Sequence, residues 1–360
     1  MPKKKILIDA SIFDSHPRRG STALCKEILK KTDAKKIYVS KHRKSFFLFD
    51  LLFKNYFVWE HLLLPIYCII YKPDYIMNIN GTSPIFLFKT KRIFMAFDLI
   101  FYNKTYNAFN WKYNKKLFFG NLYRKINFKR SINKADIIIT CSESTKRKIT
   151  KKFKPAAKIH VVYPNVKFFN DSEVASTIKK NQLVISTGFA AHKGIECLVE
   201  TINIIKEKYT DLTIIILGFK EDQKNTFFNL LEGDSISKAN IQILCNLSTQ
   251  DYYKNISNSK IFMFTSLEEG FGIPVIEAMG SKTYVICSDI DVFRELGDSS
   301  ISFCMPGSSD SFYKKFSEAY DGGYWNNEAI LANNYKLSQK FTTTNIKKQL
   351  ILYNGEINAQ

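Results

Sequence analysis

Acidic residues are scarce in this chain, and so are the patterns by which disulfides and metals are usually held. Its 360 residues contain 33 Asp and Glu against 53 Lys and Arg, which gives a formal net charge of +20. The seven cysteines are dispersed without any Cys-x-x-Cys, as is typical of a reduced cytosolic protein and not of a disulfide framework. The five histidines lack a His-Glu-x-x-His or similar spacing, so the sequence predicts no metal site.

Long hydrophobic runs are also missing. In the apolar window 46–71, the longest uncharged run is 62–71, about half of the roughly 20 residues that a spanning helix needs. The N-terminus begins like a signal peptide, but its apolar stretch ends at Asp9 and predicts a first strand instead. We therefore expect no membrane-spanning segment.

Two nucleotide fingerprints are absent. No Gly-x-Gly-x-x-Gly occurs, and the segment 188–194, Gly-Phe-Ala-Ala-His-Lys-Gly, lacks the Gly-Lys-Ser/Thr end of a phosphate-binding P-loop. This excludes an NTPase of the P-loop type.

Apolar runs fall into two comparable sets and alternate with stretches of helical spacing such as 195–205. Most are rich in Ile, Val and Phe without polar alternation, as expected for strands covered on both faces. Strand–helix alternation predicts parallel sheets with right-handed crossovers. We therefore expect an α/β protein with two doubly wound, Rossmann-like domains facing a cleft, joined by the polar stretch 165–182. The candidate strands are 6–13, 36–40, 75–80, 92–98, 136–142 and 159–163, then 183–189, 212–219, 241–246, 261–265, 284–288 and 301–305.

The segment 265–280, Thr-Ser-Leu-Glu-Glu-Gly-Phe-Gly-Ile-Pro-Val-Ile-Glu-Ala-Met-Gly, is the most informative in the chain. It follows a predicted strand, and its glycine loop 270–272 precedes Pro274, which suits the first position of a helix. Backbone N–H groups and the positive helix end converge there and favour an anion. Glu269 and Glu277 bracket this point, where carboxylates are suited to accept hydrogen bonds from hydroxyls. The segment therefore predicts a sugar-nucleotide site.

This Glu269-x7-Glu277 pattern, with Glu-Gly-Phe-Gly at its front, resembles the signature of the retaining GT-B glycosyltransferases of the GT4 type. The resemblance is clearest over 188–307, and earlier segments resemble lipopolysaccharide and O-antigen mannosyltransferase-like members. It implies metal-independent sugar transfer with retention of anomeric configuration and without a cofactor. It also implies an acceptor-side domain over 1–168, a nucleotide-sugar-binding domain over 178–335, and a C-terminal helix over 336–360 that returns to brace the first domain.

The resemblance assigns roles around the glycine loop. Glu277 matches the position that accepts hydrogen bonds from the ribose hydroxyls, and Glu269 matches the one near the transferred sugar. Complementing the helix dipole is a second role open to Glu277. The backbone amides expected to serve the sugar or its phosphate are those of Gly270, Phe271, Gly272 and Ile273.

Two basic residues follow the first strand of the second set, in the loop that begins at Gly188. Lys193 and His192 match the pair that holds the donor pyrophosphate in the family, although arginine is common at the position of His192. Lys193 is expected to neutralise the leaving diphosphate as the glycosidic bond breaks. A solvated lysine at a helix start is disfavoured by the helix dipole, which favours this role. For His192, a donor contact and no role at all are equally open.

The first set of strands carries fewer candidates. Gly20 stands where the family brings a glycine close to the donor phosphates, although an ordinary turn would also use one. The segment 96–99 aligns with a His-Asp-Leu motif, but Phe97 replaces the histidine, which leaves Asp98 as the catalytic candidate or as a cap of the following turn. Trp59-Glu-His-Leu-Leu-Leu-Pro65 resembles a helix of lipopolysaccharide-type members and equally fits a core helix.

Basic residues concentrate between 112 and 154, with fourteen Lys and Arg against two acids. An anionic membrane surface and a Lys-rich coding bias explain this equally well, whereas no nucleic-acid-binding domain is recognisable. Taken with the resemblance, the stretch predicts a peripheral enzyme on the cytoplasmic face of the membrane. It would add sugar to a polyprenyl-diphosphate-linked saccharide of a bacterial surface polysaccharide.

Two alternatives stay open. A catalytically silent, membrane-associated GT-B scaffold is compatible with the departures at 192 and 97. A GT-B sugar-nucleotide epimerase shares the fold but usually lacks Glu-Gly-Phe-Gly.

Overall fold

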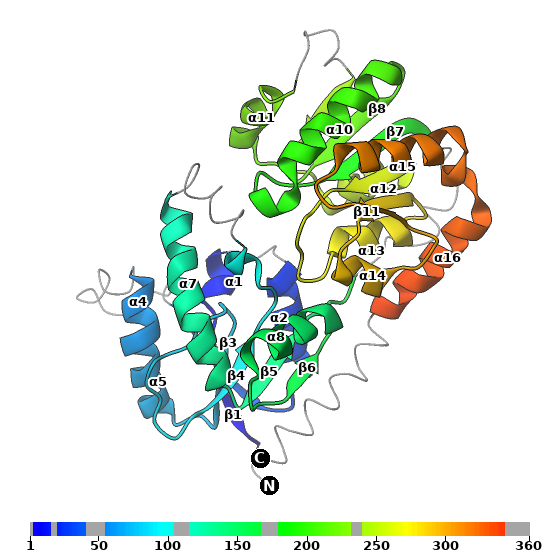
Figure 1. Ribbon diagram of the computed structural model, residues 1–360. Coiled ribbons are helices and arrows are strands. Elements are labelled where there is room, and N and C mark those ends of the chain that lie inside the picture. Colours follow the sequence, from blue (N-terminus) through cyan, green and yellow to red (C-terminus); the bar gives the residue numbers. More distant parts are fainter. Residues whose placement is uncertain are drawn as a thin grey trace. The chain divides into compact units, whose positions relative to one another are not determined.

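Two compact units make up the chain, and they part between Asn165 and Val166. The computed structural model describes residues 3–15, 20–40, 55–103, 115–166, 179–231 and 240–342. Each unit is built on its own six-stranded parallel sheet (Figure 1). The expectation of an α/β protein with two doubly wound domains is therefore confirmed. The domain boundaries predicted at 168 and 178, and most of the predicted terminal helix, lie outside the described residues.

The first sheet is wound in two directions from its first strand. Its strands are β1 (Lys5–Asp9), β2 (Lys35–Val39), β3 (Tyr75–Asn78), β4 (Lys91–Met95), β5 (Ile137–Thr140) and β6 (Ile159–Val161). They follow the order β2-β1-β3-β4-β5-β6, with all neighbours parallel. The order reverses between β1 and β3, which is the point where doubly wound sheets bind ligands.

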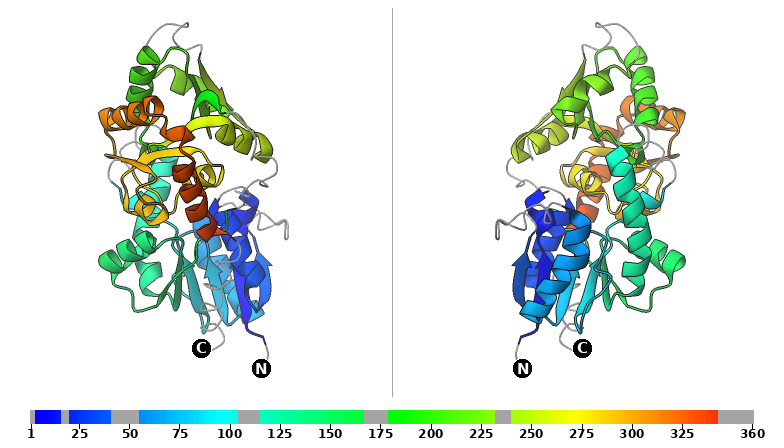
Figure 2. Two further views of the ribbon diagram at one scale, coloured as in Figure 1. Left: turned by 90° about the vertical axis from the view of Figure 1, so that its right-hand side faces the viewer. Right: turned by 90° about the vertical axis from the view of Figure 1, so that its left-hand side faces the viewer.

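Helices cover both faces of this sheet, and the layers can be followed in Figure 2. They are α1 (Ser11–Ser15), α2 (Gly20–Lys31), α4 (Tyr56–Val58), the π-helix η1 (Trp59–Leu63), α5 (Leu64–Tyr71), the 3₁₀-helix η2 (Ile100–Tyr102), α7 (Lys115–Asn133) and α8 (Glu143–Phe153). On one face, η1 and α5 pack against Leu7 and Ile76, and α7 and α8 pack against Phe94. On the other face α2 brings Cys25 Sγ to 3.5 Å from Met95 Sδ.

The first strand is shorter than the predicted run 6–13. It ends at Asp9, whose Oδ1 accepts a hydrogen bond from the backbone N–H of Ser11 at 3.1 Å. Phe13 N–H then bonds Ala10 O, so the chain turns into α1. Hydrophobicity continued past the strand because α1 is itself partly buried, and the aspartate turn ended the strand.

The second sheet has the same winding. Its strands are β7 (Lys180–Ser186), β8 (Thr213–Leu217), β9 (Ile241–Leu244), β10 (Ser259–Phe264), β11 (Tyr284–Ser288) and β12 (Ser302–Cys304). They follow the order β12-β11-β10-β7-β8-β9, all parallel. The reversal lies between β7 and β10, so the loops that follow these two strands leave the sheet side by side.

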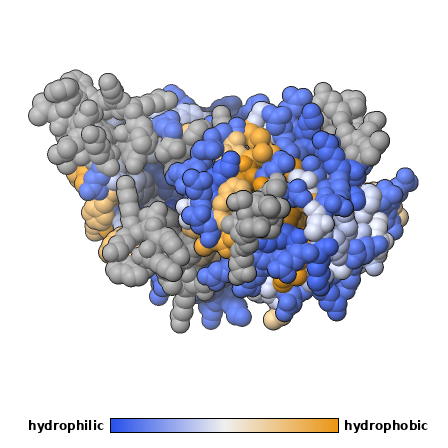
Figure 3. Space-filling view, turned by 90° about the horizontal axis from the view of Figure 1, so that it is seen from above, coloured by the Kyte–Doolittle hydropathy of each residue, from blue (hydrophilic) through white to orange (hydrophobic). Residues whose placement is uncertain are grey.

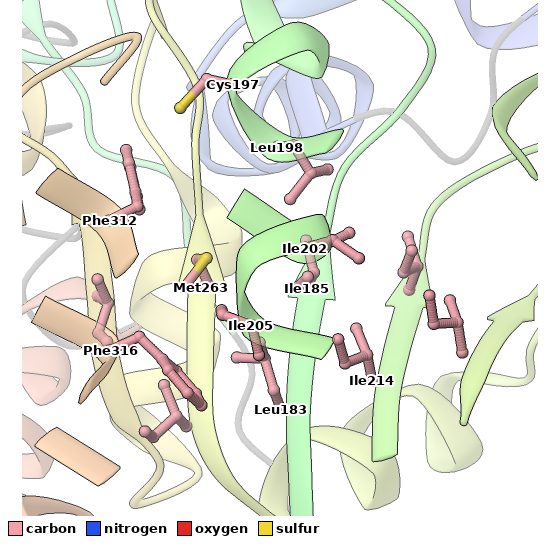
Figure 4. Close-up of a cluster of buried hydrophobic side chains, with 14 of the residues drawn as sticks. Leu183, Ile185, Cys197, Leu198, Ile202, Ile205, Ile214, Met263, Phe312 and Phe316 are labelled. Carbon is pink, nitrogen blue, oxygen red and sulfur yellow. The ribbon is translucent and has the colours of Figure 1, made fainter. Parts of the chain in front are cut away.

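Apolar stripes on the helices of the second unit explain how this sheet is covered. Leu198, Ile202 and Ile205 of α10 lie against Leu183 and Ile185 of β7 (Figure 4). Spacings of three and four residues place the three side chains on one helix face. The helices of this unit are η3 (Ala191–Lys193), α10 (Ile195–Lys208), α11 (Glu221–Phe228), α12 (Thr249–Asn258), α13 (Ile273–Gly280), α14 (Asp291–Leu296), α15 (Ser309–Asp321), η4 (Tyr324–Asn326), α16 (Glu328–Ser338) and η5 (Gln339–Phe341).

The distribution of hydrophilic and hydrophobic residues on the surface can be seen in Figure 3. Hydrophilic residues cover most of the described part of the face in Figure 3, and hydrophobic ones gather in smaller patches. Within the described ranges, every helix is too short or too polar to cross a bilayer.

Candidate active site

Two loops of the second unit meet at the reversal between β7 and β10. The loop after β7 runs to Gly194, and the loop after β10 begins at Thr265. Thr265 Oγ1 donates to Lys193 O at 2.9 Å, and Leu267 N–H donates to His192 O at 2.7 Å. Gly194 has φ 66°, and a Cβ there would lie 2.4 Å from Thr265 O. Only glycine fits this contact, so the two loops are locked together.

Lys193 and Glu269 form an ion pair across these loops. Lys193 Nζ lies 2.6 Å from Glu269 Oε1, and both side chains are largely buried. The ammonium group also lies 4.9 Å from the ring centre of Phe264, the last residue of β10. The predicted leaving-group lysine and the predicted sugar-side glutamate are therefore brought together at the edge of the sheet.

Burial and nearby charges shift the pKa values of Glu269 and of the neighbouring His192. Burial by itself raises the pKa of Glu269, but Lys193 and His192 outweigh it, so the pKa lies below its ordinary value. Burial lowers the pKa of His192 to about 4, with Glu269 opposing and Lys193 assisting the shift. At neutral pH Glu269 is a carboxylate and His192 is uncharged. The cation beside Glu269 is therefore Lys193 and not His192.

The glycine loop ends on the start of α13. Gly272 has φ 108°, and a Cβ there would lie 2.6 Å from the ring of Phe293. Helix α13 begins at Ile273, so Pro274 occupies its second position and not the predicted first. Proline suits either place, because the N–H groups of the first turn have no partner within the helix.

The other residues of the glycine loop contribute either backbone amides or a buried side chain. Phe271 is buried, and its ring packs edge-on against Phe341 at 5.4 Å between centroids. Its side chain therefore belongs to the core, and only backbone amides of the loop are suited to an anion. Gly270 and Gly272 add no side chain between these amides and a ligand. Gly188 lies just past β7, where a Cβ would have ordinary contact distance to Gly218 O.

Glu277 is held by two tyrosines that the sequence argument did not identify. Tyr252 donates its hydroxyl to Glu277 Oε2 at 2.9 Å, and Tyr253 donates to Oε1 at 3.0 Å. Burial raises the pKa of Glu277, and both tyrosine hydrogen bonds oppose the shift. A carboxylate has about four lone-pair sites, so two further hydroxyl donors can be accepted.

The tyrosines come from α12, which follows the loop after β9. That loop leaves the sheet at the same edge as the loops after β7 and β10, because all the strands are parallel. Adjacent tyrosines on a helix point in different directions, so their convergence on one carboxylate follows only from how α12 lies against α13.

In the first unit, the predicted residues have local structural roles. Asp98 Oδ1 accepts a hydrogen bond at 3.2 Å from the backbone N–H of Ile100, the first residue of η2. Gly20 is the first residue of α2. Ser142 is fully buried and caps α8 by accepting a hydrogen bond from Thr145 N–H at 3.0 Å.

Asp289, in the Asp-Ile-Asp sequence 289–291, forms an ion pair. Asp289 binds Arg294 through two contacts of 2.6 and 2.7 Å, and Asp291 begins α14. Within the part of the chain that the structure describes, no three His, Cys, Asp or Glu side chains gather as metal ligands would.

Comparison with known proteins finds similarity mainly in the second unit. Residues 167–336 match the model of the family Glycosyl transferases group 1. The O-antigen chain mannosyltransferase RfbU of Salmonella typhimurium is 27% identical over 197 residues, which are 54% of this chain and 54% of that protein. The chain spans about half the length of the curated relatives it matches.

Solved structures cover the whole chain. Sucrose-phosphate synthase from Thermosynechococcus elongatus has a TM-score of 0.70 at 14% identity and covers 99% of this chain and 100% of that one. Anabaena Alr3699/HepE in complex with UDP and glucose has a TM-score of 0.65 at 12% identity, covering 98% and 99%. At these identities the likeness shows the fold. The chain therefore has the two-domain GT-B fold, and its residues 167–336 are similar to the glycosyl transferases group 1.

Proposed function

We propose that this protein transfers a sugar from a nucleotide-sugar donor to a glycan acceptor in the synthesis of a bacterial surface polysaccharide. The observation that carries the proposal is the Lys193–Glu269 pair, held 2.6 Å apart beside the glycine loop and the start of α13. One cation, a set of backbone amides and a carboxylate then lie at the reversal point of one sheet. Diphosphate and sugar hydroxyls are the groups that this combination complements.

In this proposal the donor is held at both ends. Lys193 and the amides around Gly270 to Ile273 receive the diphosphate, and Glu277 receives the ribose hydroxyls with its orientation set by Tyr252 and Tyr253. Glu269 accepts hydrogen bonds from the transferred sugar. A lysine and a helix start supply the positive charge that a leaving diphosphate needs, so the proposed reaction uses no metal.

The proposed reaction is a substitution at the anomeric carbon with retention. The bond from that carbon to the diphosphate oxygen breaks, and its electron pair leaves with the diphosphate toward Lys193. The acceptor hydroxyl oxygen forms the new bond from the same face, and its proton passes to the departing diphosphate. GT4-type resemblance and the neutralising groups around Lys193 support this course.

The proposed acceptor is a saccharide on a polyprenyl diphosphate at the cytoplasmic face of the membrane. Relatives named as O-antigen chain mannosyltransferases support a polysaccharide product. Helices α5 and α7 support a lipid surface, because apolar side chains on them face outward: Leu62 just before α5, with Ile66, Ile69 and Ile70 on α5, and Phe119, Leu122 and Ile126 on α7.

Basic residues accompany these apolar side chains in the same helical layer. Helix α8 carries exposed Arg147, Lys151 and Lys152. Apolar groups flanked by Lys and Arg complement an anionic bilayer, where each basic residue contributes about 1 kcal/mol.

Binding of nucleotide-sugars tests the donor assignment. UDP-, GDP-, dTDP- and ADP-sugars are titrated calorimetrically in EDTA against the wild type, Glu277→Gln and Lys193→Met. The matched control is Glu318→Gln, which removes a surface carboxylate bound to Lys315 at 2.7 Å. We expect one nucleotide to bind the wild type and the control, and both site variants to lose at least tenfold in affinity.

Other outcomes would favour the alternatives. If no nucleotide binds, the silent scaffold becomes the better interpretation. If the donor sugar is epimerised without an acceptor, as NMR of the incubated nucleotide-sugar would reveal, the epimerase interpretation replaces the transferase.

A further inference from the structure

The carboxylate of Glu277 has a hydrogen-bond donor from its own chain on each of its two oxygens. Tyr252 donates its hydroxyl to Oε2 at 2.9 Å, and Tyr253 donates to Oε1 at 3.0 Å. An ionised carboxylate accepts hydrogen bonds and does not donate them, and its two oxygens offer about four lone-pair sites. About two sites, one on each oxygen, are therefore left for the hydroxyl groups of a ligand.

Packing holds the two tyrosines in place beside this carboxylate. Their rings meet edge to face, with the ring centres 5.6 Å apart. Tyr253 is buried, whereas Tyr252 and Glu277 are partly exposed. Ser186, the last residue of β7, also forms a hydrogen bond with the hydroxyl of Tyr252. The phenol groups are therefore fixed by the fold, while a ligand still has access to Glu277.

Both phenol groups keep the proton that they donate to Glu277. Burial raises the pKa of Tyr252 well above its ordinary value, and the charge of Glu277 assists this shift while the hydrogen bond of Ser186 opposes it. Burial and the charge of Glu277 also raise the pKa of Tyr253. Neither hydroxyl therefore ionises near neutral pH, and both remain donors to the carboxylate.

The sugar of a nucleotide brings one or two hydroxyl groups to Glu277. Ribose has hydroxyls on its 2′ and 3′ carbons, which together fill the two remaining lone-pair sites. A 2′-deoxyribose has only the 3′ hydroxyl, so one of these sites stays unfilled. Because each oxygen of Glu277 already has a tyrosine donor, neither oxygen is then left without a hydrogen bond.

A carboxylate without such internal donors would discriminate strongly between the two sugars. Sites that hydrogen-bond a substrate hydroxyl reject the analogue lacking it by about 10⁴- to 10⁵-fold, because a buried polar group of the protein is left unpaired. At Glu277 the tyrosine hydroxyls remove this cause of rejection. The contacts of Tyr252 and Tyr253 therefore bear on which nucleotides the donor site accepts.

We propose that Tyr252 and Tyr253 widen the donor specificity of this protein to nucleotides of both ribose and 2′-deoxyribose, an inference that rests on the proposed transferase function. The donor class then consists of nucleoside diphosphate sugars with either pentose, dTDP-sugars included. Tyr252 and Tyr253 are positioning residues, because they act on the nucleotide through Glu277.

Matched sets of nucleotides test this inference. UDP, GDP and ADP are each compared with their 2′-deoxy and 3′-deoxy forms, and dTDP with its ribose counterpart, by calorimetry with the full chain at pH 8 in EDTA. Base and diphosphate are identical within a set, so the ratio of Kd values reports the missing hydroxyl alone. The variants are Tyr252→Phe, Tyr253→Phe and the double variant. The matched control is Tyr209→Phe, whose hydroxyl donates to Asp321 Oδ2 at 2.8 Å.

For the base that the donor site prefers, we expect loss of either hydroxyl to weaken binding to the wild type and to Tyr209→Phe by less than about tenfold. In the double variant each oxygen of Glu277 depends on the ligand, so the ratio of Kd values should rise at least about tenfold further. Tyr252→Phe should raise this ratio for one of the two deoxy forms and Tyr253→Phe for the other, because each substitution removes the donor to one oxygen.

Two results would overturn the inference while the proposed function stands. One is a wild type that binds the ribose form and loses tenfold or more when a hydroxyl is missing. The other is a set of tyrosine variants that weaken the ribose and deoxyribose forms equally, as a purely structural role would. If the double variant does not fold by circular dichroism, the wild type and the single variants decide. If no nucleotide of any set binds the wild type, the proposed function itself fails, and the inference fails with it.

Discussion

Lys193 and Glu269 are 76 residues apart in sequence and form one ion pair in the fold. Without a ligand, Glu269 neutralises the lysine that a donor diphosphate would need. A bound nucleotide-sugar would therefore share the ammonium group with the carboxylate. Removing Glu269 would leave the largely buried ammonium group of Lys193 without its ion-pair partner, which is unfavourable.

His192 makes stability depend on pH. Below its ordinary pKa of 6.5 it takes up a proton in the unfolded chain, but in the folded chain it stays neutral until about pH 4. Acid therefore favours unfolding over this interval, by at most about 1.4 kcal/mol per pH unit. We expect urea titrations from pH 7 to 4.5 to show a steeper loss of unfolding free energy in the wild type than in His192→Asn. Parallel curves for the two proteins would contradict this.

The tyrosines that hold Glu277 should control its charge. Tyr252→Phe or Tyr253→Phe removes a hydrogen bond to the carboxylate, worth about 1.5–3 kcal/mol. The pKa of Glu277, already raised by burial, then rises further, and protonated Glu277 accepts poorly from ribose. We expect nucleotide affinity to fall about tenfold, and the loss to be larger at lower pH than at higher pH.

Tyr209→Phe is the matched control for this prediction, because its hydroxyl bonds Asp321 Oδ2 at 2.8 Å elsewhere in the same unit. Equal effects of all three substitutions would show that the tyrosines stabilise the unit without positioning Glu277.

At the scale of elements, the glycine loop depends on one backbone conformation. Gly272→Ala places a methyl group 2.6 Å from Phe293 at φ 108°, so the loop and the start of α13 must shift. We expect a loss of about 1–3 kcal/mol in unfolding free energy and loss of nucleotide binding. Gly323→Ala is the control, because φ there is 67° and nothing lies within 4 Å of the new Cβ. Similar nucleotide binding in the two variants would refute the role of the loop.

At the scale of the whole molecule, charge and exposed apolar surface predict attachment to anionic bilayers. Charge reversal at Arg147 and Lys151 of α8 and at the exposed Lys154 directly after it should reduce binding to phosphatidylglycerol-containing vesicles at least tenfold, because each basic residue contributes about 1 kcal/mol. Sedimentation with vesicles of phosphatidylcholine, with and without phosphatidylglycerol, measures it.

The control for membrane attachment reverses the same number of charges in the second unit, at Lys208, Lys220 and Lys254. If both triple variants sediment alike, net charge alone drives binding and α8 has no special part. If neither differs from the wild type, the membrane proposal falls and the donor site is unaffected.

Much of the fold could be predicted because the residues that become buried in each strand form a continuous apolar run in the sequence. Strands such as 183–186 and 261–264 are continuous apolar runs, and a parallel sheet covered on both faces requires such runs. The end of β1 was misplaced because Asp9 turns the chain through a side-chain hydrogen bond, which hydrophobicity does not record.

Sequence by itself determined the two-domain α/β class and the positions of Lys193, Glu269 and Glu277 on loops and a helix start. Local propensity and a contiguous motif encode these features. Tertiary structure alone decided that Lys193 reaches Glu269, that Tyr252 and Tyr253 converge on Glu277, and that Tyr123 links Glu60 to His61. Those contacts depend on strand order and on the directions in which separate helices point, and neither is a property of any short segment.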